Sequence, residues 1–157
     1  MWVSSMEKIK LIEPTIEYEK DIWDFRQEIL DSDDKDKFAG CGTLEICSSA
    51  KEWIENCKLR SNKDTCPIGK VPSNVYIAIR INDNKIVGII DLRHHIDHPI
   101  LSSWGGHIGY YVRPNERKKG YGKEMLRLNL INAQKFGIKK VLITCDENNI
   151  TSEKTII

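Results

Sequence analysis

One strand-turn-helix segment in the second half of the chain limits its possible folds more than any other part. A strand-like run from His107 to Val112 is stopped by Pro114, and a polar turn then leads into Gly120-Tyr121-Gly122. The strongest helix pattern of the chain follows, from Gly120 to Phe136, with a narrow polar strip on an otherwise apolar surface. We therefore expect a strand, a basic turn and a largely buried helix in that order.

The start of this helix has the properties of an anion-binding site. The first N–H groups of a helix have no partner within it, and the helix dipole adds positive charge at that end. Gly120 and Gly122 let the backbone approach an anion closely. Four basic residues surround the same spot: Arg117, Lys118, Lys119 and Lys123. The combination predicts a site for a diphosphate or a similar anion, although it matches neither the P-loop nor the dinucleotide fingerprint.

The rest of the chain adds strands and helices in an order typical of an α+β fold. Apolar periodicity and turn residues predict a first strand at 8–12, helices at 15–30 and from Ser48 or Ser49 through Cys57, a hairpin of strands at 75–80 and 85–93, and a fifth strand at 140–144 before a last short helix. This order predicts a central sheet with helices packed on it. The polar connection 58–72 is long enough to be a candidate lining of a substrate entrance.

Composition limits the class of partner. The 157 residues, 40% hydrophobic and 30% charged, fit one domain over 1–157. A net charge of +1, from 24 basic and 23 acidic residues, argues against binding to nucleic acid or to an anionic membrane. Without a signal-peptide pattern or a membrane-length apolar run, we expect a cytoplasmic protein. Five cysteines lack the spacing of zinc sites or redox motifs, so free thiols are expected.

The motif region resembles a known enzyme superfamily. Ile108-Gly109-Tyr110-Tyr111-Val112-Arg113-Pro114, followed by Arg117-Lys118-Lys119-Gly120-Tyr121-Gly122, is similar to the acetyl-CoA signature of the GNAT superfamily of N-acetyltransferases, Arg/Gln-x-x-Gly-x-Gly/Ala. The element order matches over most of the chain, and the specific motif lies between His107 and Asn149. The resemblance implies a mixed, mostly antiparallel central sheet flanked by helices, and acetyl transfer from acetyl-CoA to a primary amine of a small molecule, peptide or protein.

The resemblance also implies roles in binding acetyl-CoA. The backbone of Tyr110, Tyr111 and Val112 would pair with the pantetheine arm as an added strand. The amides of Lys118, Lys119, Gly120, Tyr121, Gly122 and Lys123, with the Arg117 side chain, would hold the pyrophosphate. An N–H of the same strand, that of Val112 or a neighbour, would contact the oxygen on which charge develops. Asn149 matches the asparagine that reaches the pantetheine, and Ser152 matches a small residue one turn later.

The catalytic residues are less well defined by the motif. His107 stands where many family members place a glutamate that acts as a base, and an imidazole titrates close to neutral pH, so His107 is the candidate general base. A histidine satisfied by strand neighbours or by solvent is the alternative. The tyrosine that usually serves as general acid is replaced by Ile156. Asp91 and Arg93 alternate along a strand, where they face either the acceptor or a solvent-exposed surface.

No metal site is expected. The cluster His94-His95-Ile96-Asp97-His98 lacks the helical spacing of zinc ligands, so a polar loop near the acceptor entrance is the preferred interpretation. A nucleic-acid-binding module is also disfavoured by the near-zero net charge.

The end of the chain departs from the family pattern. It stops at Ile157, within the expected last helix, whereas the family continues through two more strands. We therefore expect either truncation or a homodimer in which the partner covers the apolar fifth strand, because an unpaired edge promotes aggregation. These missing strands and the missing tyrosine favour an alternative function, a non-catalytic acyl-CoA-binding domain.

Overall fold

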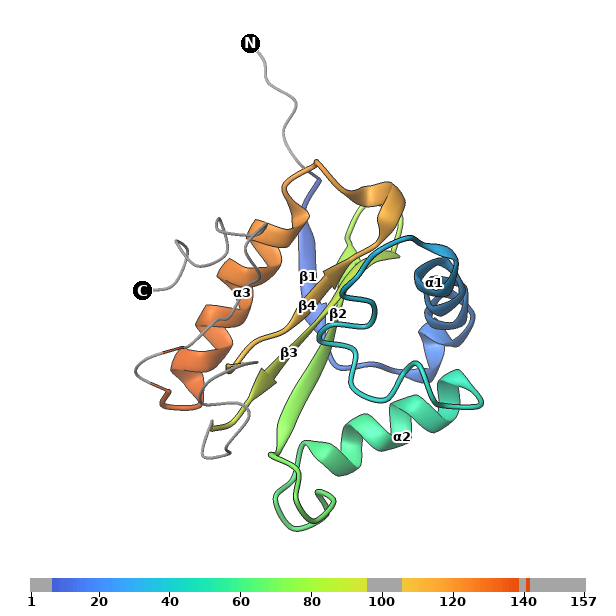
Figure 1. Ribbon diagram of the computed structural model, residues 1–157. Coiled ribbons are helices and arrows are strands. Elements are labelled where there is room, and N and C mark those ends of the chain that lie inside the picture. Colours follow the sequence, from blue (N-terminus) through green and yellow to red (C-terminus); the bar gives the residue numbers. More distant parts are fainter. Residues whose placement is uncertain (1–6, 96–105, 139–140, 142–157) are drawn as a thin grey trace.

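The computed structural model describes residues 7–95, 106–138 and 141, and its elements follow the expected order (Figure 1). They are β1 (Ile9–Ile12), a 3-10 helix η1 (Ile16–Tyr18), α1 (Glu19–Asp31), α2 (Ala50–Arg60), β2 (Ser73–Arg80), β3 (Lys85–Arg93), β4 (Tyr110–Val112), a second 3-10 helix η2 (Pro114–Glu116) and α3 (Tyr121–Lys135). The expectation of an α+β fold is confirmed.

The four described strands form one antiparallel sheet in the order β1-β2-β3-β4. Pairing of β2 with β3 runs from Ser73 opposite Arg93 to Arg80 opposite Lys85, which confirms the predicted hairpin. The hairpin turn ends at Asn84, whose φ of 59° lies in the left-handed region that asparagine tolerates better than most residues. Sequence identified this hairpin because its two apolar runs flank a short Asn/Asp turn.

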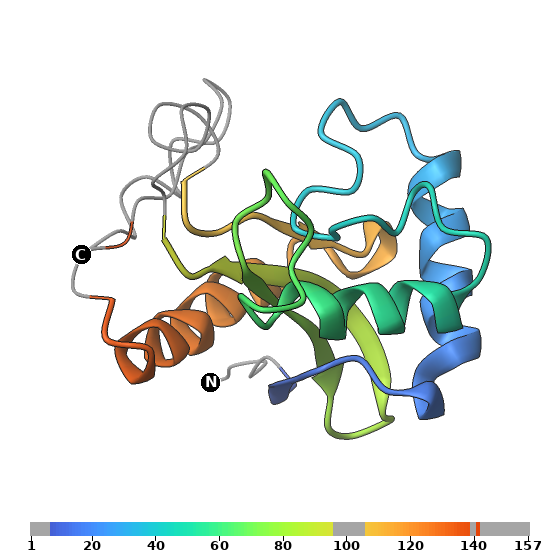
Figure 2. The same cartoon turned by 90° about the horizontal axis from the view of Figure 1, so that it is seen from below.

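Helices cover both faces of the sheet (Figure 1, Figure 2). On one face α1 and α2 pack over a cluster that includes Phe25, Trp53 and Ile89, each fully buried. On the other face α3 packs over a second cluster, which includes Ile90 and Met125. Strand β3 is therefore buried along almost its whole length, because it contributes side chains to both layers.

The structure corrects several element boundaries. The first turn after Thr15 is a 3-10 helix, and the Thr15 side chain makes no capping hydrogen bond. Ser49, not Ser48, caps α2, where its hydroxyl accepts a hydrogen bond from the Glu52 N–H. Phe136, expected on the buried surface of its helix, is 48% exposed, and its ring stacks on His94.

Strand β4 is shorter than the predicted strand at 107–112. Only Tyr110–Val112 has regular strand pairing. Two backbone hydrogen bonds, from the Asp91 N–H to the Gly109 carbonyl and from the Arg93 N–H to the His107 carbonyl, extend the contact with β3 to the residues that precede β4. The predicted segment thus lies beside β3 over its full length.

Some expectations fall outside the described residues. They are the fifth strand apart from Val141, the last helix with Asn149, Ser152 and Ile156, and the part of the histidine cluster from Ile96 onward. Within the described part of the chain, no helix is both long and apolar enough to cross a membrane.

Candidate active site

A buried polar cluster fixes the turn between β4 and α3. The Glu116 carboxylate, in η2, accepts hydrogen bonds from Arg80 at 2.8 Å and from Lys119 at 2.9 Å. Arg80 also lies 3.3 Å from the Tyr121 hydroxyl. Burial alone would raise the pKa of Glu116, but the hydrogen bonds from Arg80 and Lys119 lower it below its ordinary value. Glu116 is therefore charged near neutral pH and holds the turn against β2.

The first amides of α3 are available to a ligand. Gly120 precedes the helix with a φ of 89°, and Lys118 also has a left-handed φ, 65°. In the described part of the chain, the N–H groups of Tyr121, Gly122 and Lys123 have no hydrogen-bond acceptor. Unpaired amides at a helix N-terminus are the geometry that an anion site requires.

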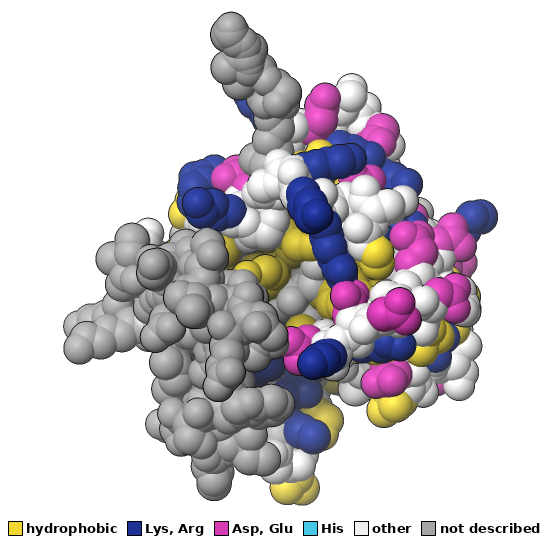
Figure 3. Space-filling model, turned by 45° about the horizontal axis from the view of Figure 1, so that its top comes forward, with side chains coloured by type: hydrophobic (Ala, Val, Ile, Leu, Met, Phe, Trp, Pro, Cys, Tyr) yellow, Lys and Arg dark blue, Asp and Glu magenta, His cyan; other side chains and the backbone are white. Residues whose placement is uncertain are grey.

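The surroundings of these amides are basic. Lys118, Lys119 and Lys123 are exposed around the turn. Figure 3, in which the top of Figure 1 comes forward, shows Lys and Arg side chains gathered beside a hollow with hydrophobic side chains at its floor. The Tyr121 side chain, in contrast, is buried against the second core cluster, so this residue can offer a ligand only its backbone.

Glycines bring α3 close to the sheet. A Cβ atom at Gly122 would lie 3.4 Å from the Tyr110 ring and 3.4 Å from the Val112 side chain. At Gly88 on β3 a Cβ would lie 2.6 Å from the sulfur of Met125. The helix can therefore start directly beside the end of β4, which places its amides next to that strand.

On the side away from β3, β4 presents the backbone groups of alternate residues. The Gly109 carbonyl and the Arg113 N–H both bond to the backbone of β3. Since backbone groups alternate in direction along an antiparallel strand, those of Tyr110 and Val112 point away from β3. Among the described strands β4 is the last of the sheet. The Val112 carbonyl already accepts a hydrogen bond of 3.2 Å from Arg117 on this side.

The Arg117 side chain is held by Asp34, which follows α1. The terminal nitrogens of Arg117 donate to the Asp34 carboxylate at 2.9 and 2.6 Å, and the Arg117 guanidinium lies 5.0 Å from the centre of the Tyr111 ring. Tyr111 donates its hydroxyl proton to the same carboxylate. The hydrogen bond from Arg117 holds the pKa of Asp34 well below its usual range. The turn after α1, which contains Asp34, thus lies against the basic turn and β4.

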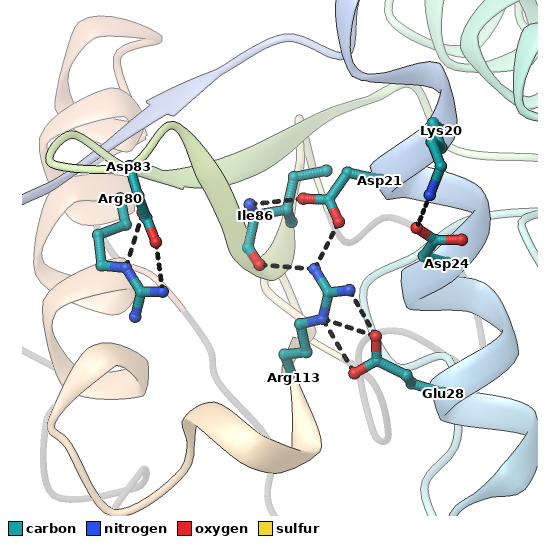
Figure 4. Close-up of polar contacts among 8 residues, drawn as sticks. All are labelled: Lys20, Asp21, Asp24, Glu28, Arg80, Asp83, Ile86 and Arg113. Carbon is teal, nitrogen blue, oxygen red and sulfur yellow. Dashed lines mark hydrogen bonds and ion pairs between the residues drawn. The ribbon is translucent and has the colours of Figure 1, made fainter.

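A buried arginine, Arg113, joins α1 to β3 and β4 (Figure 4). Arg113 is 3% exposed and donates to Asp21 at 2.9 Å, to the Ile86 carbonyl at 3.0 Å and to both carboxylate oxygens of Glu28. Its guanidinium also lies 5.3 Å from the centre of the Phe25 ring. This cluster fixes the end of β4 from which the basic turn begins.

His107 lies at the other end of this segment and is 7% exposed. Its carbonyl accepts the hydrogen bond from Arg93, and the neighbouring Ile108 packs in the core beneath α3. Alternation along the strand places His107 on the opposite face, the one that α1 and α2 cover. Burial, with the nearby charges of Arg93 and His95, lowers the pKa of His107 below its ordinary value. A neutral imidazole near pH 7, able to accept a proton, is the result.

A cavity of about 480 Å³ opens on that same face. It is surrounded by the loop 38–43, the C-terminal half of α2, the loop 67–70, the first residues of β2 and the last residues of β3. Asp91 and Arg93, which alternate along β3, are both in its wall. The Asp91 carboxylate is 5% exposed, accepts the Gly109 N–H at 2.7 Å and lies 3.4 Å from Arg93. Burial raises its pKa above the ordinary value.

Three or more potential metal ligands do not come together anywhere in the part of the chain that the structure describes. Within the histidine cluster, His94 contacts the Asn74 side chain at 2.6 Å.

Comparison with known proteins decides the family. The model of the acetyltransferase (GNAT) family matches residues 13–155, which is nearly the whole chain. The chain belongs to the GNAT acetyltransferase family. GNAT proteins catalyse acetyl transfer that depends on acetyl-CoA.

Solved structures share the fold of this GNAT chain. A candidate ribosomal-protein-serine acetyltransferase from Vibrio cholerae matches with a TM-score of 0.61 and 16% identity, over 97% of this chain and 78% of that one. The microcin C7 self-immunity acetyltransferase MccE, solved with acetyl-CoA and AMP, matches with a TM-score of 0.60 and 18% identity, over 96% and 76%. A GNAT acetyltransferase from Staphylococcus aureus Mu50 matches with a TM-score of 0.52 and 19% identity, over 94% of this chain and 79% of that one. No curated protein has a matching sequence.

Proposed function

We propose that this protein transfers the acetyl group of acetyl-CoA to a primary amine of a small molecule or peptide. The observation that carries the proposal is the continuous backbone surface that runs from the unpaired amides of α3 to the outer edge of β4. In this proposal the amides from Lys118 to Lys123 hold the pyrophosphate. The backbone of Tyr110 and Val112 pairs with the pantetheine arm in the manner of an added strand.

The order of these parts gives the donor a direction. The N-terminus of α3 follows the C-terminal end of β4, so an arm bound along the strand runs from there toward Gly109 and His107. Three strand residues span about 10 Å, enough for much of an extended arm. The thioester would then lie near the start of β4, beside the face that carries His107 and the cavity. MccE, which shares this fold, was solved with acetyl-CoA, and this supports the choice of donor.

The reaction exchanges two bonds at one carbon. A bond forms between the amine nitrogen and the acetyl carbon, and the bond from that carbon to sulfur breaks. The nitrogen loses a proton to His107, which is neutral because its pKa is lowered, and the thiolate takes a proton from solvent. An outward N–H of β4, that of Val112 or Tyr110, donates to the acetyl oxygen as negative charge develops there.

Thiol release from acetyl-CoA in the presence of a panel of amines tests this function. We expect release to equal the amount of acetylated amine. His107→Gln should lower kcat by about 10²- to 10⁴-fold, the usual contribution of a general base, and leave the Kd of acetyl-CoA unchanged. His95→Gln is the control for the electrostatic part of the effect, because His95 contributes to the lowered pKa of His107 but leaves the proposed base in place.

Two results would change the conclusion. If the protein binds acetyl-CoA tightly but none of the amines increases the rate of thiol release, it is a non-catalytic acyl-CoA-binding domain. Failure to bind acetyl-CoA at all would overturn the proposal.

A further inference from the structure

We infer that the cavity beside β3 selects amines that also carry an anionic group, a carboxylate or a phosphate, and that Asp91 binds the ammonium end of such an acceptor. This inference rests on the proposed function and adds the chemical class of its acceptor. It is carried by the position of one buried acid and by the cations that share the cavity with it.

Asp91 lies where the acceptor nitrogen has to be. Its carboxylate is bonded to the Gly109 N–H, immediately before the strand whose outer edge receives the donor. The loop 38–43 closes on the same place, since a Cβ atom at Gly40 would lie 2.2 Å from the Gly109 carbonyl oxygen. The inner end of the cavity and the start of the donor edge are thus separated by little more than the backbone of β4. An amine held by Asp91 is therefore close to the end of the arm.

Asp91 also retains capacity to bind a cation. Each carboxylate oxygen accepts about two hydrogen bonds, and Asp91 is bonded to one N–H and lies 3.4 Å from Arg93. Burial disfavours the charged form of Asp91 more than the Arg93 guanidinium favours it, as the raised pKa indicates. A bound ammonium would add a second positive charge beside the carboxylate.

The other charges of the cavity are positive. Arg60, at the end of α2, and Lys70, in the loop before β2, line it together with Arg93. Arg60 uses its Nε to donate to the Val71 carbonyl at 2.9 Å, and its positive charge partly offsets the effect of burial on the pKa of Asp91. Of the residues in the cavity wall that the structure describes, Asp91 alone is acidic.

This charge distribution favours a ligand with two ends. An amine without other charge would meet three cations and one acid, and like charges in a shared cavity disfavour binding. An amine with an anionic group places its ammonium at Asp91 and its anion near Arg60 and Lys70. The volume of about 480 Å³ is typical of sites that enclose a small molecule, so a metabolite-sized acceptor fits it.

Calorimetry on the whole protein without acetyl-CoA tests the cavity directly. Three ligands of equal chain length are titrated: an ω-amino carboxylic acid, its neutral carboxamide and the corresponding aminoalkyl phosphate. We expect at least one anionic ligand to bind about tenfold or more tightly than the carboxamide, and the better of the two identifies the anion. Equal affinities for all three, or no binding of any, would overturn the inference.

Variants assign the roles. Lys70→Gln and Arg60→Gln should each reduce the preference for the anionic ligand by about fivefold, whereas Lys63→Gln, which removes a charge from the same loop outside the cavity, should not. Asp91→Asn should weaken all three amines alike and keep the preference. If Asp91→Asn bound the amines as tightly as the wild type, Asp91 would not be the ammonium site. If Lys70→Gln and Arg60→Gln both kept the full preference for the anionic ligand, these cations would not bind its anion.

The two proposals can fail separately. If acetyl-CoA binds and the carboxamide is acetylated as efficiently as the acid, acetyl transfer stands and anion selection falls. If the protein binds anionic amines selectively but does not bind acetyl-CoA, the cavity assignment stands and the proposed function falls.

Discussion

Asp34 pairs with Arg117, the arginine side chain of the proposed donor site. Its carboxylate takes both terminal nitrogens of Arg117 and the hydroxyl of Tyr111, so the guanidinium is already paired. A diphosphate at the α3 amides would compete with Asp34 for Arg117 and would also be repelled by its charge. The ion pair therefore weakens anion binding in this arrangement.

Removal of this acid should tighten binding of the donor. In Asp34→Asn, the guanidinium is released and one negative charge beside the anion site is lost. We expect the Kd of CoA to fall by about fivefold, corresponding to ~1 kcal/mol for a partly exposed pair. Titration calorimetry measures this, with Asp33→Asn as a control that removes an adjacent exposed charge. Weaker binding by Asp34→Asn would instead mean that Asp34 orients Arg117 for the ligand.

His107 should titrate below the ordinary imidazole value of 6.5. Burial and the charge of Arg93 both disfavour the imidazolium, so both lower its pKa. An NMR titration of the imidazole protons, assigned by the signal missing in His107→Gln, gives the midpoint. Arg93→Gln should raise this midpoint toward 6.5. A midpoint at or above 6.5 in the wild-type protein would show that an acidic partner, and not burial, sets the state of His107.

Sequence yields candidates where a role depends on local order, but it does not reveal contacts that form across the fold. The glycines and lysines before α3 became candidates because an anion site at a helix N-terminus needs only a few consecutive residues. Asp34 is 83 positions from Arg117, and Asp21 is 92 positions from Arg113. No spacing rule links such pairs, so an acidic turn was indistinguishable from a solvated loop.

At the scale of elements, the same division applies. The β2–β3 hairpin and the helix after the basic turn were predictable because short turns and apolar periodicity define them. The ends of β4 were not, because its pairing depends on where β3 continues rather than on its own side chains. The cavity was also missed, since four segments that are separate in sequence enclose it.

The N-terminus of α3 can be tested with its own C-terminal glycine as control. Gly120 and Gly137 flank the helix with φ values of 89° and 78°, so alanine at either position costs about 1 kcal/mol of backbone strain. Only Gly120→Ala disturbs the turn that presents the first amides. We expect the Kd of CoA to rise at least tenfold in Gly120→Ala and to stay unchanged in Gly137→Ala, although both lose similar stability. Equal affinities in the two variants would remove the α3 amides from the donor site.

At the scale of the whole molecule, Arg113 connects the layer of α1 with the strand that carries the donor edge. Because the guanidinium is 3% exposed and bonded to Asp21 and Glu28, its removal leaves two carboxylates without their cation. Arg113→Ala should lower the free energy of unfolding by about 3–5 kcal/mol, as for other broken buried ion pairs. Urea unfolding measures this. Arg127→Ala, which breaks an exposed pair with Glu124, should change stability little, and a similar loss in both would contradict the structural role of Arg113.

Asp91 allows stability and function to be compared across pH. Its raised pKa means that the folded state binds a proton more tightly than the unfolded chain, so its contribution to stability is present at low pH and is lost as pH rises. In Asp91→Asn this loss disappears, and we expect the variant to be at least as stable as the wild type at pH 7, with the advantage shrinking as the pH falls toward 4.

Urea unfolding at several pH values measures the difference, and Asp83→Asn provides a control of opposite sign, because Arg80 lowers the pKa of Asp83. That variant should be less stable than the wild type at pH 7, with a deficit that shrinks on acidification. A carboxylate that lowers stability at pH 7, and whose removal weakens amine binding, has the properties expected of a ligand-binding residue. If Asp91→Asn were instead less stable at pH 7, the carboxylate would serve mainly to hold Gly109 against β3, and the acceptor would need another anchor.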